Sequence, residues 1–154
     1  MQAVYRQAVP GDIPQIQVVR HSVTENRLSD PSRVTDADCE DYLTRRGRGW
    51  VCQLGEEIIA FAIVDVSDHN VWALFVKPAH EKKGIGKKLM ALMLDWYFSR
   101  TTETLWLSTG TNTRAEQFYR QQGWQDAGMQ SPEERRFEMT YEQWQQLKNA
   151  TLNS

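Results

Sequence analysis

Cysteine is scarce in this sequence. Only Cys39 and Cys52 occur among its 154 residues. They show no Cys-x-x-Cys spacing, and no cluster of histidines lies near either of them in the sequence. Because zinc sites and disulfide frameworks need such clusters, the sequence predicts no metal site and no disulfide scaffold. We expect both cysteines to be ordinary buried or half-buried thiols.

Long apolar runs and an excess of one charge are also absent. No apolar stretch reaches the length needed to span a membrane, and the N-terminal residues do not follow the pattern of a signal peptide. The formal net charge is -2, and charged residues make up 25% of the chain, which argues against nucleic acid as the main partner. We therefore expect a cytoplasmic protein whose partners include neither a membrane nor nucleic acid.

The length and composition that remain are those of an ordinary globular domain. A chain of 154 residues can bury a sizeable core without cross-links, and we expect a single domain over residues 1–154. Six tryptophans are many for a protein of this size. Most of them should lie in the core, although one or two could wall a ligand pocket, because the large indole also carries a polar N–H group.

The most informative stretch covers residues 71–90. The segment from Val71 to Lys77 is apolar on both faces, which predicts a strand in the centre of a sheet. Pro78 ends this strand, and Gly84 and Gly86 follow in a short basic loop. After the loop, apolar residues recur with a helical period, which predicts a helix to about residue 100 with Ile85, Leu89, Leu92, Met93 and Trp96 on one stripe.

The beginning of this helix carries lysines where the helix dipole is already positive. Lys87 and Lys88 lie in the first turn, so we expect an anion close by to offset them. Glycines let the backbone approach a ligand, and the free N–H groups of a first helical turn point toward it, so the segment has the parts of a phosphate cradle. The alternative is a solvated basic turn that leads into a core helix.

Two familiar phosphate-binding motifs do not fit this loop. A Walker loop needs a serine or threonine after its Gly-Lys pair, and Lys88 stands at that position. A dinucleotide fingerprint needs a third glycine where Leu89 stands. The spacing therefore argues against a nucleotide-binding protein that uses this loop.

Local patterns predict further elements on both sides of this stretch. Thr113-x-x-Glu116 is a capping box that begins a helix, and Gly123 stands where the glycine at its C-terminal end is expected. Thr35 or Asp36 caps another helix. We expect strands at 3–9, 50–54, 58–66, 104–108, 124–127 and 135–139, and helices at 12–20, 36–46, 113–122 and around Trp144. This order predicts a mixed α/β fold, with a single layer of sheet flanked by helices.

The segments Val76–Pro78 and Glu81–Gly86 resemble the acyl-CoA-binding motif of the GNAT superfamily of N-acetyltransferases, a strand ending in V-x-P followed by [RQ]-x-x-G-x-[GA] and a helix. Residues Asn112–Trp124 resemble the family signature N-x-x-A-x-x-[FL]-Y-x-x-x-G-[FW]. The element order also matches the GNAT fold, which implies one mixed, mostly antiparallel sheet flanked by helices. One departure is Glu81, where the family usually has Arg or Gln.

The resemblance implies acetyl-CoA as cosubstrate and assigns residues to it. The backbone of Leu74, Phe75 and Val76 would hold the pantetheine arm. Asn112 would contact the cofactor near the pantetheine, and Tyr119 would be the general acid that protonates the departing thiolate. Each has a plainer alternative, because Asn112 fits a helix cap and Tyr119 fits a buried aromatic of a helix. The pyrophosphate would lie on the loop residues Lys82, Lys83, Gly84, Ile85, Gly86 and Lys87.

The general base and the acceptor site are less visible in the sequence. Some relatives carry a glutamate five residues before the asparagine, and Leu107 stands there in this chain. Asp65, Asp68 and His69 lie near the right strands but fit turns equally well. Glu25 lies in a polar loop between two predicted helices, and we expect it to line the acceptor side of the cleft. A chain of water molecules would need no base at all.

The leading hypothesis is an N-acetyltransferase that transfers an acetyl group from acetyl-CoA to a primary amine of a small molecule or of a protein or peptide. The competing hypothesis is a catalytically silent acyl-CoA-binding regulatory module that has kept the cofactor loop. The resemblance also leaves room for a homodimer, because family members often pair through the edge of the sheet.

Overall fold

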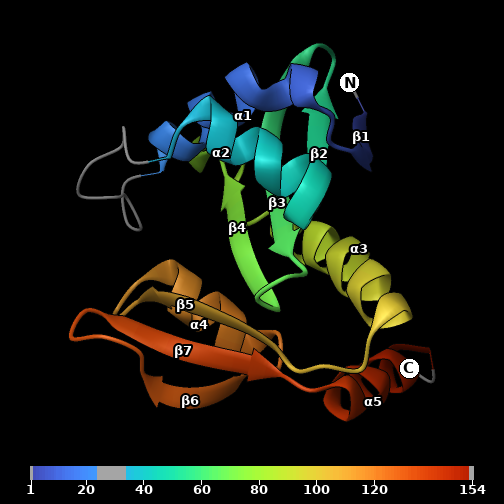
Figure 1. Ribbon diagram of the computed structural model, residues 1–154, viewed down its shortest axis with the longest axis vertical. Coiled ribbons are helices and arrows are strands. Elements are labelled where there is room, and N and C mark those ends of the chain that lie inside the picture. Colours follow the sequence, from blue (N-terminus) through green and yellow to red (C-terminus); the bar gives the residue numbers. More distant parts are fainter. Residues whose placement is uncertain (1, 24–33, 153–154) are drawn as a thin grey trace.

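The computed structural model describes residues 2–23 and 34–152. They form a seven-stranded sheet with the strand order β1-β2-β3-β4-β5-β7-β6 (Figure 1). Neighbouring strands are antiparallel except β4 and β5, which are parallel. The predicted mixed, mostly antiparallel sheet is therefore confirmed, and β4 lies at its centre as expected. The strands are β1 (Ala3–Gln7), β2 (Gly47–Leu54), β3 (Glu57–Asp65), β4 (Asn70–Val76), β5 (Leu105–Gly110), β6 (Gln125–Met129) and β7 (Glu134–Met139).

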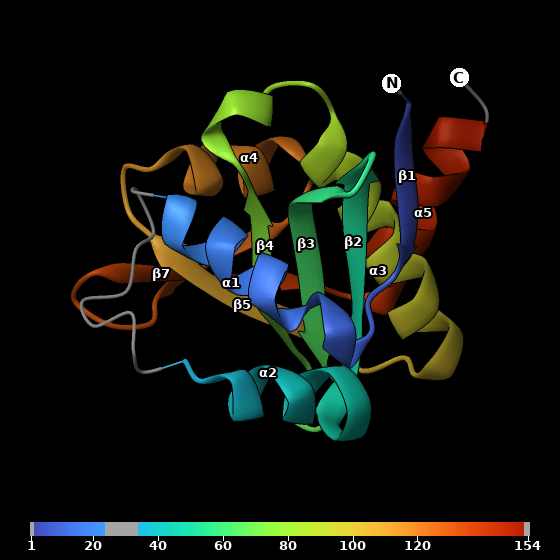
Figure 2. The ribbon, with the colours of Figure 1, turned by 90° about the horizontal axis from the view of Figure 1, so that it is seen from above.

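Helices cover both faces of the sheet. Figure 2 shows α1 and α2 on one face and α3 on the other. The helices are α1 (Ile13–Ser22), α2 (Asp36–Asp41), which continues into a π-helical turn (Tyr42–Arg46), α3 (Ile85–Arg100), α4 (Arg114–Gln121) and α5 (Tyr141–Leu152). Short 3-10 turns occupy Pro10–Asp12 and Pro78–His80. Within the described ranges, no helix is both long and apolar enough to cross a membrane.

Strand β3 shows how one segment separates two cores. Phe61 and Ile63 belong to the apolar cluster on the α1 side of the sheet. Ala60 and Ala62 belong to the cluster on the α3 side, because successive side chains of a strand point to opposite faces. All four side chains are fully buried. Burial on both faces is expected for a strand that has helices packed on each side.

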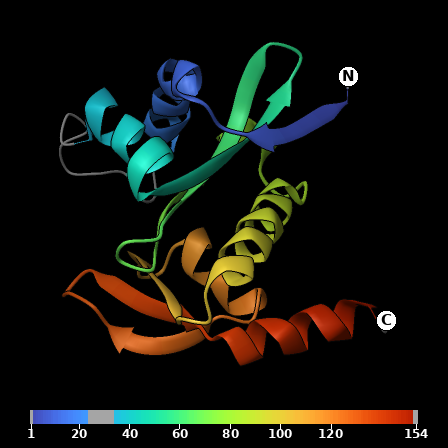
Figure 3. The same cartoon turned by 45° about the vertical axis from the view of Figure 1, so that its right-hand side comes forward.

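Helix α3 is buried more widely than the sequence indicated. Of the predicted stripe, Leu92 and Trp96 are only half-buried, while Tyr97 and Phe98 lie in the core. The reason is a second neighbour, α5, which runs beside the C-terminal part of α3 (Figures 1 and 3). Phe98 stacks on Trp144 of α5 with ring centroids 5.2 Å apart. A single apolar stripe is expected for a helix that packs against one neighbour, whereas α3 packs against both the sheet and α5.

The parallel pair of β4 and β5 is short. One pair of residues, Asn70 and Trp106, forms its register. The Trp106 N–H donates to the His69 carbonyl at 2.9 Å, and the indole Nε1 donates to the Asp68 carbonyl at 2.9 Å. These bonds hold the two strands together at the beginning of β4, and the strands diverge from there (Figure 1). The side of β4 that faces β5 therefore keeps backbone polar groups available for a ligand.

Candidate active site

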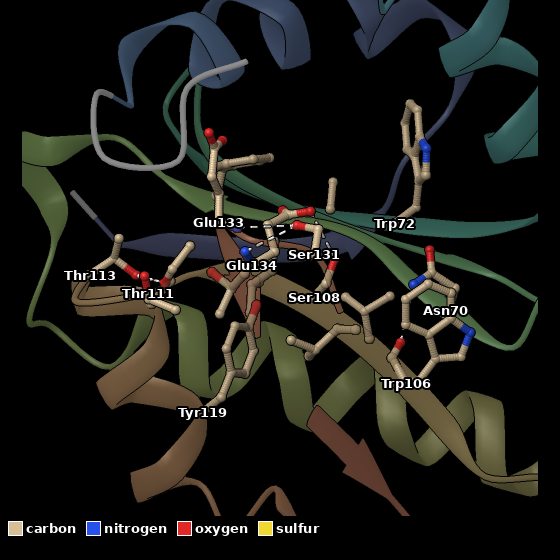
Figure 4. Close-up of a pocket in the computed structure, with 18 of the residues that line it drawn as sticks. Asn70, Trp72, Trp106, Ser108, Thr111, Thr113, Tyr119, Ser131, Glu133 and Glu134 are labelled. Atoms are coloured by element: carbon tan, nitrogen blue, oxygen red, sulfur yellow. Dashed lines mark hydrogen bonds between the residues drawn. The ribbon is translucent and has the colours of Figure 1, made fainter. Parts of the chain in front are cut away.

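Two cavities open where β4 and β5 diverge. The first, which we call the strand cavity, has a volume of about 700 Å³ and is lined by both strands and by the turn before β7 (Figure 4). The second, the loop cavity, has a volume of about 500 Å³ and is lined by the end of β4, the glycine loop, the first turn of α3 and one side of α4. Four residues line both cavities, namely Leu74, Phe75, Ala115 and Tyr119. The two cavities therefore meet beside the end of β4.

The glycine loop has the geometry of an anion cradle. Lys82 and Gly84 both take left-handed backbone conformations, with φ of 63° and 80°. The first helical hydrogen bond of α3 runs from the Lys88 N–H to the Gly84 carbonyl at 3.1 Å. The N–H groups that precede it, from Ile85 to Lys87, therefore point out of the helix end into the loop cavity. A group with negative charge fits this position.

Most residues assigned to the cofactor from the sequence line this cavity. They are Leu74, Phe75, Val76, Lys82, Gly84, Ile85, Gly86 and Lys87. Lys83 does not occur among the described residues that line either cavity. Lys88 turns away from the loop, because its ammonium group lies 4.4 Å from the ring centroid of Tyr5. The structure thus brings together the strand end and the loop that were predicted to act on one ligand.

Asn112 lies before α4 and is exposed. Its φ of 60° is left-handed, a conformation that asparagine tolerates better than most residues. Its N–H donates to Oε2 of Glu116 at 3.0 Å, and the Glu116 N–H donates to Oγ1 of Thr113 at 3.2 Å. The predicted Thr113 cap is therefore present, with Glu116 reaching one residue further back than expected. Asn112 is not among the described residues that line the two cavities.

Tyr119 faces both cavities from α4. Its residue surface is 6% exposed, and its ring contacts those of Phe118, Trp124 and Phe137. Figure 4 shows the hydroxyl end pointing from α4 toward the strand cavity. Burial raises the pKa of Tyr119 well above its ordinary value, so the phenol stays protonated at neutral pH. The ring of Tyr119 therefore packs in the core while its hydroxyl end faces the strand cavity.

Glu81 is held by an ion pair across the mouth of the loop cavity. Its Oε2 accepts a hydrogen bond from Nη1 of Arg114, the first residue of α4. Both residues line the loop cavity. The carboxylate that stands where the related motif has Arg or Gln is therefore neutralised locally, and a cation still faces the same cavity.

Residues 16–124 match the sequence profile of the Acetyltransferase (GNAT) family. The chain belongs to this family. No curated protein sequence matches it at a significant level. Among solved structures, it is similar to the PaiA N-acetyltransferase from Thermoplasma acidophilum in complex with coenzyme A, with TM-score 0.78, 13% identity, and coverage of 92% of this chain and 100% of the other.

Two further solved structures share the fold. The ribosomal-protein-S18-alanine N-acetyltransferase from Escherichia coli has TM-score 0.70 and 18% identity, with coverage of 90% of this chain and 92% of the other. An acetyltransferase of the GNAT family from Staphylococcus aureus Mu50 has TM-score 0.77 and 14% identity, with coverage of 91% and 99%. At these identities the likeness establishes the GNAT fold of this chain, in agreement with the family match.

The three side chains considered as base candidates in this GNAT domain have structural roles in and beside the turn between β3 and β4. Asp65 is 1% exposed; its Oδ2 accepts from Arg46 at 2.8 Å and its Oδ1 accepts the Ser67 N–H at 2.9 Å. Nδ1 of His69 is hydrogen-bonded to the hydroxyl of Tyr97 at 2.8 Å. Asp65, Asp68 and His69 are absent from the described residues lining the two cavities. Their structural roles are therefore turn formation and core packing.

The strand cavity of this GNAT domain contains polar residues that sequence reasoning missed. Arg20 and His21 reach it from α1, Glu133 from the turn before β7, and Glu134 from the first position of β7. Glu134 arrives there because β7 pairs with β5, which sets Glu134 opposite Gly110. No local pattern marks these residues, because their neighbours in space are distant in the sequence. Trp72 and Trp106 also line this cavity, so the expected pocket-walling tryptophans are these two.

The remaining expectations concern metals, thiols and the acceptor loop. Among the described residues, no group of three or more His, Cys, Asp or Glu side chains could hold a metal ion. Cys39 and Cys52 are buried free thiols, as predicted. Glu25, predicted to line the acceptor side, lies outside the described residues. The described chain ends before it at Val23, which lines the loop cavity.

Proposed function

We propose that this protein is an acetyl-CoA-dependent N-acetyltransferase that acetylates a primary amine of a small molecule or of a protein or peptide. The observation that carries the proposal is the meeting of two cavities at Tyr119. One cavity offers an anion cradle at the beginning of α3, and the other opens between β4 and β5. Two reactants can thus reach one point from different sides.

The loop cavity is the proposed cofactor site. Outward-pointing N–H groups at the beginning of α3 bind the pyrophosphate, and Lys82 and Lys87 add positive charge. The pantetheine arm lies along β4, where Leu74, Phe75 and Val76 lack a strand partner on the side of β5. A Cβ atom at Gly86 would lie at an ordinary contact distance of 3.5 Å from the Phe118 ring, so Phe118 bounds the site beside this glycine. Lys83 and Asn112 remain proposed cofactor contacts from the edge of the site.

The strand cavity is the proposed acceptor site. The amine nitrogen attacks the thioester carbonyl carbon, and a backbone N–H of β4 stabilises the oxyanion that forms. The carbon–sulfur bond then breaks, and the Tyr119 hydroxyl gives its proton to the thiolate. Glu133 and Glu134 lie in the same cavity and attract a protonated amine, which releases one proton to solvent before it attacks. The second proton leaves the nitrogen as the amide forms and restores the Tyr119 hydroxyl that protonated the thiolate.

Glu25 belongs to the same proposal on the acceptor side. Helix α1 ends at Ser22, and His21 and Val23 line the strand and loop cavities respectively. Val23, the last described residue before Glu25 in the sequence, therefore lines one of the two cavities. This position supports the proposal that Glu25 binds the acceptor.

Calorimetry and turnover separate this function from its alternatives. Acetyl-CoA and CoA are expected to bind in the micromolar range, about 8 kcal/mol, and ATP much more weakly. A panel of primary amines, followed by release of the CoA thiol, is expected to contain at least one acetylated amine. Binding of acetyl-CoA with no turnover of any amine would favour the catalytically silent module, and equal binding of ATP would favour a nucleotide-binding protein.

A further inference from the structure

Arg20 is a buried cation in the wall of the strand cavity. Only 8% of its surface is exposed, and it lines the cavity from the last turns of α1. Its guanidinium carbon lies 4.9 Å from the ring centroid of Trp72, 5.2 Å from that of Phe75 and 5.8 Å from that of Phe61. Aromatic rings therefore surround the planar guanidinium. None of these three rings offers an atom that could accept a hydrogen bond from the N–H groups at the edge of the guanidinium.

Two of the three guanidinium nitrogens of Arg20 find no acceptor in the part of the chain that the structure describes. The Nε and Nη2 atoms of Arg20 are buried and have no hydrogen-bond partner among the described residues. Among the residues that the structure describes, the titratable neighbour that interacts with Arg20 is Cys39, and burial raises the pKa of its thiol, so the thiol is neutral at neutral pH. Burial lowers the pKa of Arg20, yet a guanidinium remains protonated in proteins.

Two other partly buried arginines, Arg6 and Arg46, are paired with carboxylates. Arg6 binds Asp12 at 2.8 Å, and Arg46 binds Asp65 at 2.8 Å. A buried charge without a partner is costly, so a ligand that supplied an acceptor to Arg20 would be bound favourably there. Stacking on rings uses the faces of the guanidinium and leaves its N–H groups in the plane, the arrangement that binds a carboxylate with two parallel hydrogen bonds.

The strand cavity also contains charge of the opposite sign. Glu133 and Glu134 lie on one side of it and Trp72 on another (Figure 4). Arg20 packs against Trp72, so positive and negative groups belong to different walls. Arg20 does not line the loop cavity, which separates it from the proposed phosphate site. An amine that also carries an anionic group could pair with the cation of one wall through its anionic group and with the glutamates of the other wall through its ammonium group.

We propose that the acceptor is a small free amine that also carries a carboxylate, and that Arg20 binds this carboxylate. The inference rests on the proposed function and narrows its substrate class. The cavity of about 700 Å³ has room for a molecule of amino-acid size. The carboxylate lies at the Arg20 edge, and the amine lies toward Tyr119 and the glutamates.

Matched pairs of acceptors test this assignment. Leucine, phenylalanine, glutamate and lysine are each compared with the corresponding C-terminal amide, with kcat/KM measured by release of the CoA thiol. The acid is expected to exceed the amide by at least about tenfold for the preferred pair, the scale of a charge-assisted bidentate contact. Equal kcat/KM values for acids and amides in the wild type would overturn the proposal.

Arg20→Met is expected to bring the acid-to-amide ratio close to one, because methionine fills the aromatic site without charge. Arg48→Met is the matched control, since Arg48 stacks on Trp96 at 4.7 Å outside both cavities, and its ratio is expected to match the wild type. An unchanged ratio in folded Arg20→Met would overturn the proposal. If that variant does not fold, Arg20→Lys replaces it. Its acid-to-amide ratio of kcat/KM is expected to fall at least about threefold from the wild-type value, because lysine keeps the charge but lacks the two parallel N–H donors of the guanidinium.

Direct binding separates this inference from the proposed function. Calorimetry with the N-acetyl amino acids and the N-acetyl amino-acid amides measures the Arg20 contact without turnover. Tighter binding of the acids to the wild type, lost in Arg20→Met, supports the carboxylate site even if no amine of the panel is acetylated; in that case the transferase proposal fails alone. Equal binding of acids and amides, combined with observed acetylation of other amines, leaves the transferase function standing and overturns the role of Arg20.

Discussion

Glu81, directly before the lysine-rich loop, is ion-paired to Arg114 in the first turn of α4. The pair joins the two segments that enclose the loop cavity, and it places one charge of each sign at its mouth. A carboxylate beside a phosphate site opposes anion binding, and the guanidinium offsets this opposition. The departure from the usual Arg or Gln of the motif is therefore compensated from another element, which no inspection of the motif alone can reveal.

Glu81→Gln is expected to tighten acetyl-CoA binding by roughly threefold to tenfold, because it removes a negative charge from the proposed phosphate site while an amide still contacts Arg114. Calorimetry at about 50 and 300 mM salt measures the effect, and the gain is expected to shrink at the higher salt. Asp41→Asn is the control, since it changes net charge equally and belongs to the exposed pair with Arg45. Weaker binding by Glu81→Gln would show that the carboxylate positions Arg114 for the ligand.

Gly84→Asp is expected to weaken acetyl-CoA binding by at least ~2 kcal/mol, because it brings a negative charge to the cradle and disturbs its charge-assisted hydrogen bonds. Gly128→Asp is a matched control. Both glycines have positive φ, 80° and 90°, and open space where a Cβ would lie, but Gly128 is on β6 and outside both cavities. Backbone strain is therefore similar in the two variants. Comparable affinities of the two folded variants would remove the loop from the cofactor site.

Tyr119→Phe keeps the ring and its packing and deletes the hydroxyl. If the phenol protonates the thiolate, kcat is expected to fall ~10²–10⁴-fold with little change in CoA binding. Because burial raises the pKa of Tyr119, the wild type should not lose this acid below about pH 10. Tyr97→Phe removes the hydroxyl of another buried tyrosine, which bonds His69 outside the cavities, and is expected to leave kcat unchanged. A Tyr119→Phe enzyme within about threefold of wild type would reduce this residue to packing.

Asp126 ties α4 to the β6–β7 hairpin and makes stability depend on pH. The Gly128 N–H, Arg135 and Arg120 lower the pKa of Asp126 to about 2. A carboxyl with a depressed folded pKa stabilises the protein fully above its unfolded pKa near ~3.9 and loses this contribution as pH falls toward about 2.

Asp126→Asn is therefore expected to lower Tm by about 3 °C at pH 7, and the difference from wild type should vanish as pH falls through this window. Thermal melts followed by circular dichroism across the window provide the measurement. Asp95→Asn, which removes an exposed pair with Lys148, is expected to show a smaller effect. A difference between wild type and Asp126→Asn that persists at low pH would contradict the assignment.

Several elements and their ends could be predicted from short stretches of sequence. Thr113 accepts the Glu116 N–H, and Thr35 accepts the Asp38 N–H, as their capping patterns indicate. Gly84 takes a positive φ directly before α3, and Gly123 does so after α4. The proposed cofactor loop was visible in the sequence for the same reason, since its parts are consecutive. In each case the atoms involved lie within one helical turn of the chain.

The wall of the strand cavity was decided by tertiary structure. Arg20 meets Trp72 and Phe75 only because α1 packs on the face of β4, and Glu134 enters the cavity only because β7 pairs with β5. The helices, the strands and the glycine loop could be predicted from short stretches, because caps, turns and periodicity depend on neighbouring residues. Which charged side chains meet in the cavity depends on residues far apart in the chain. The packing of α1, β4 and β7 brings them together, and it leaves two Arg20 nitrogens with no hydrogen-bond partner among the described residues.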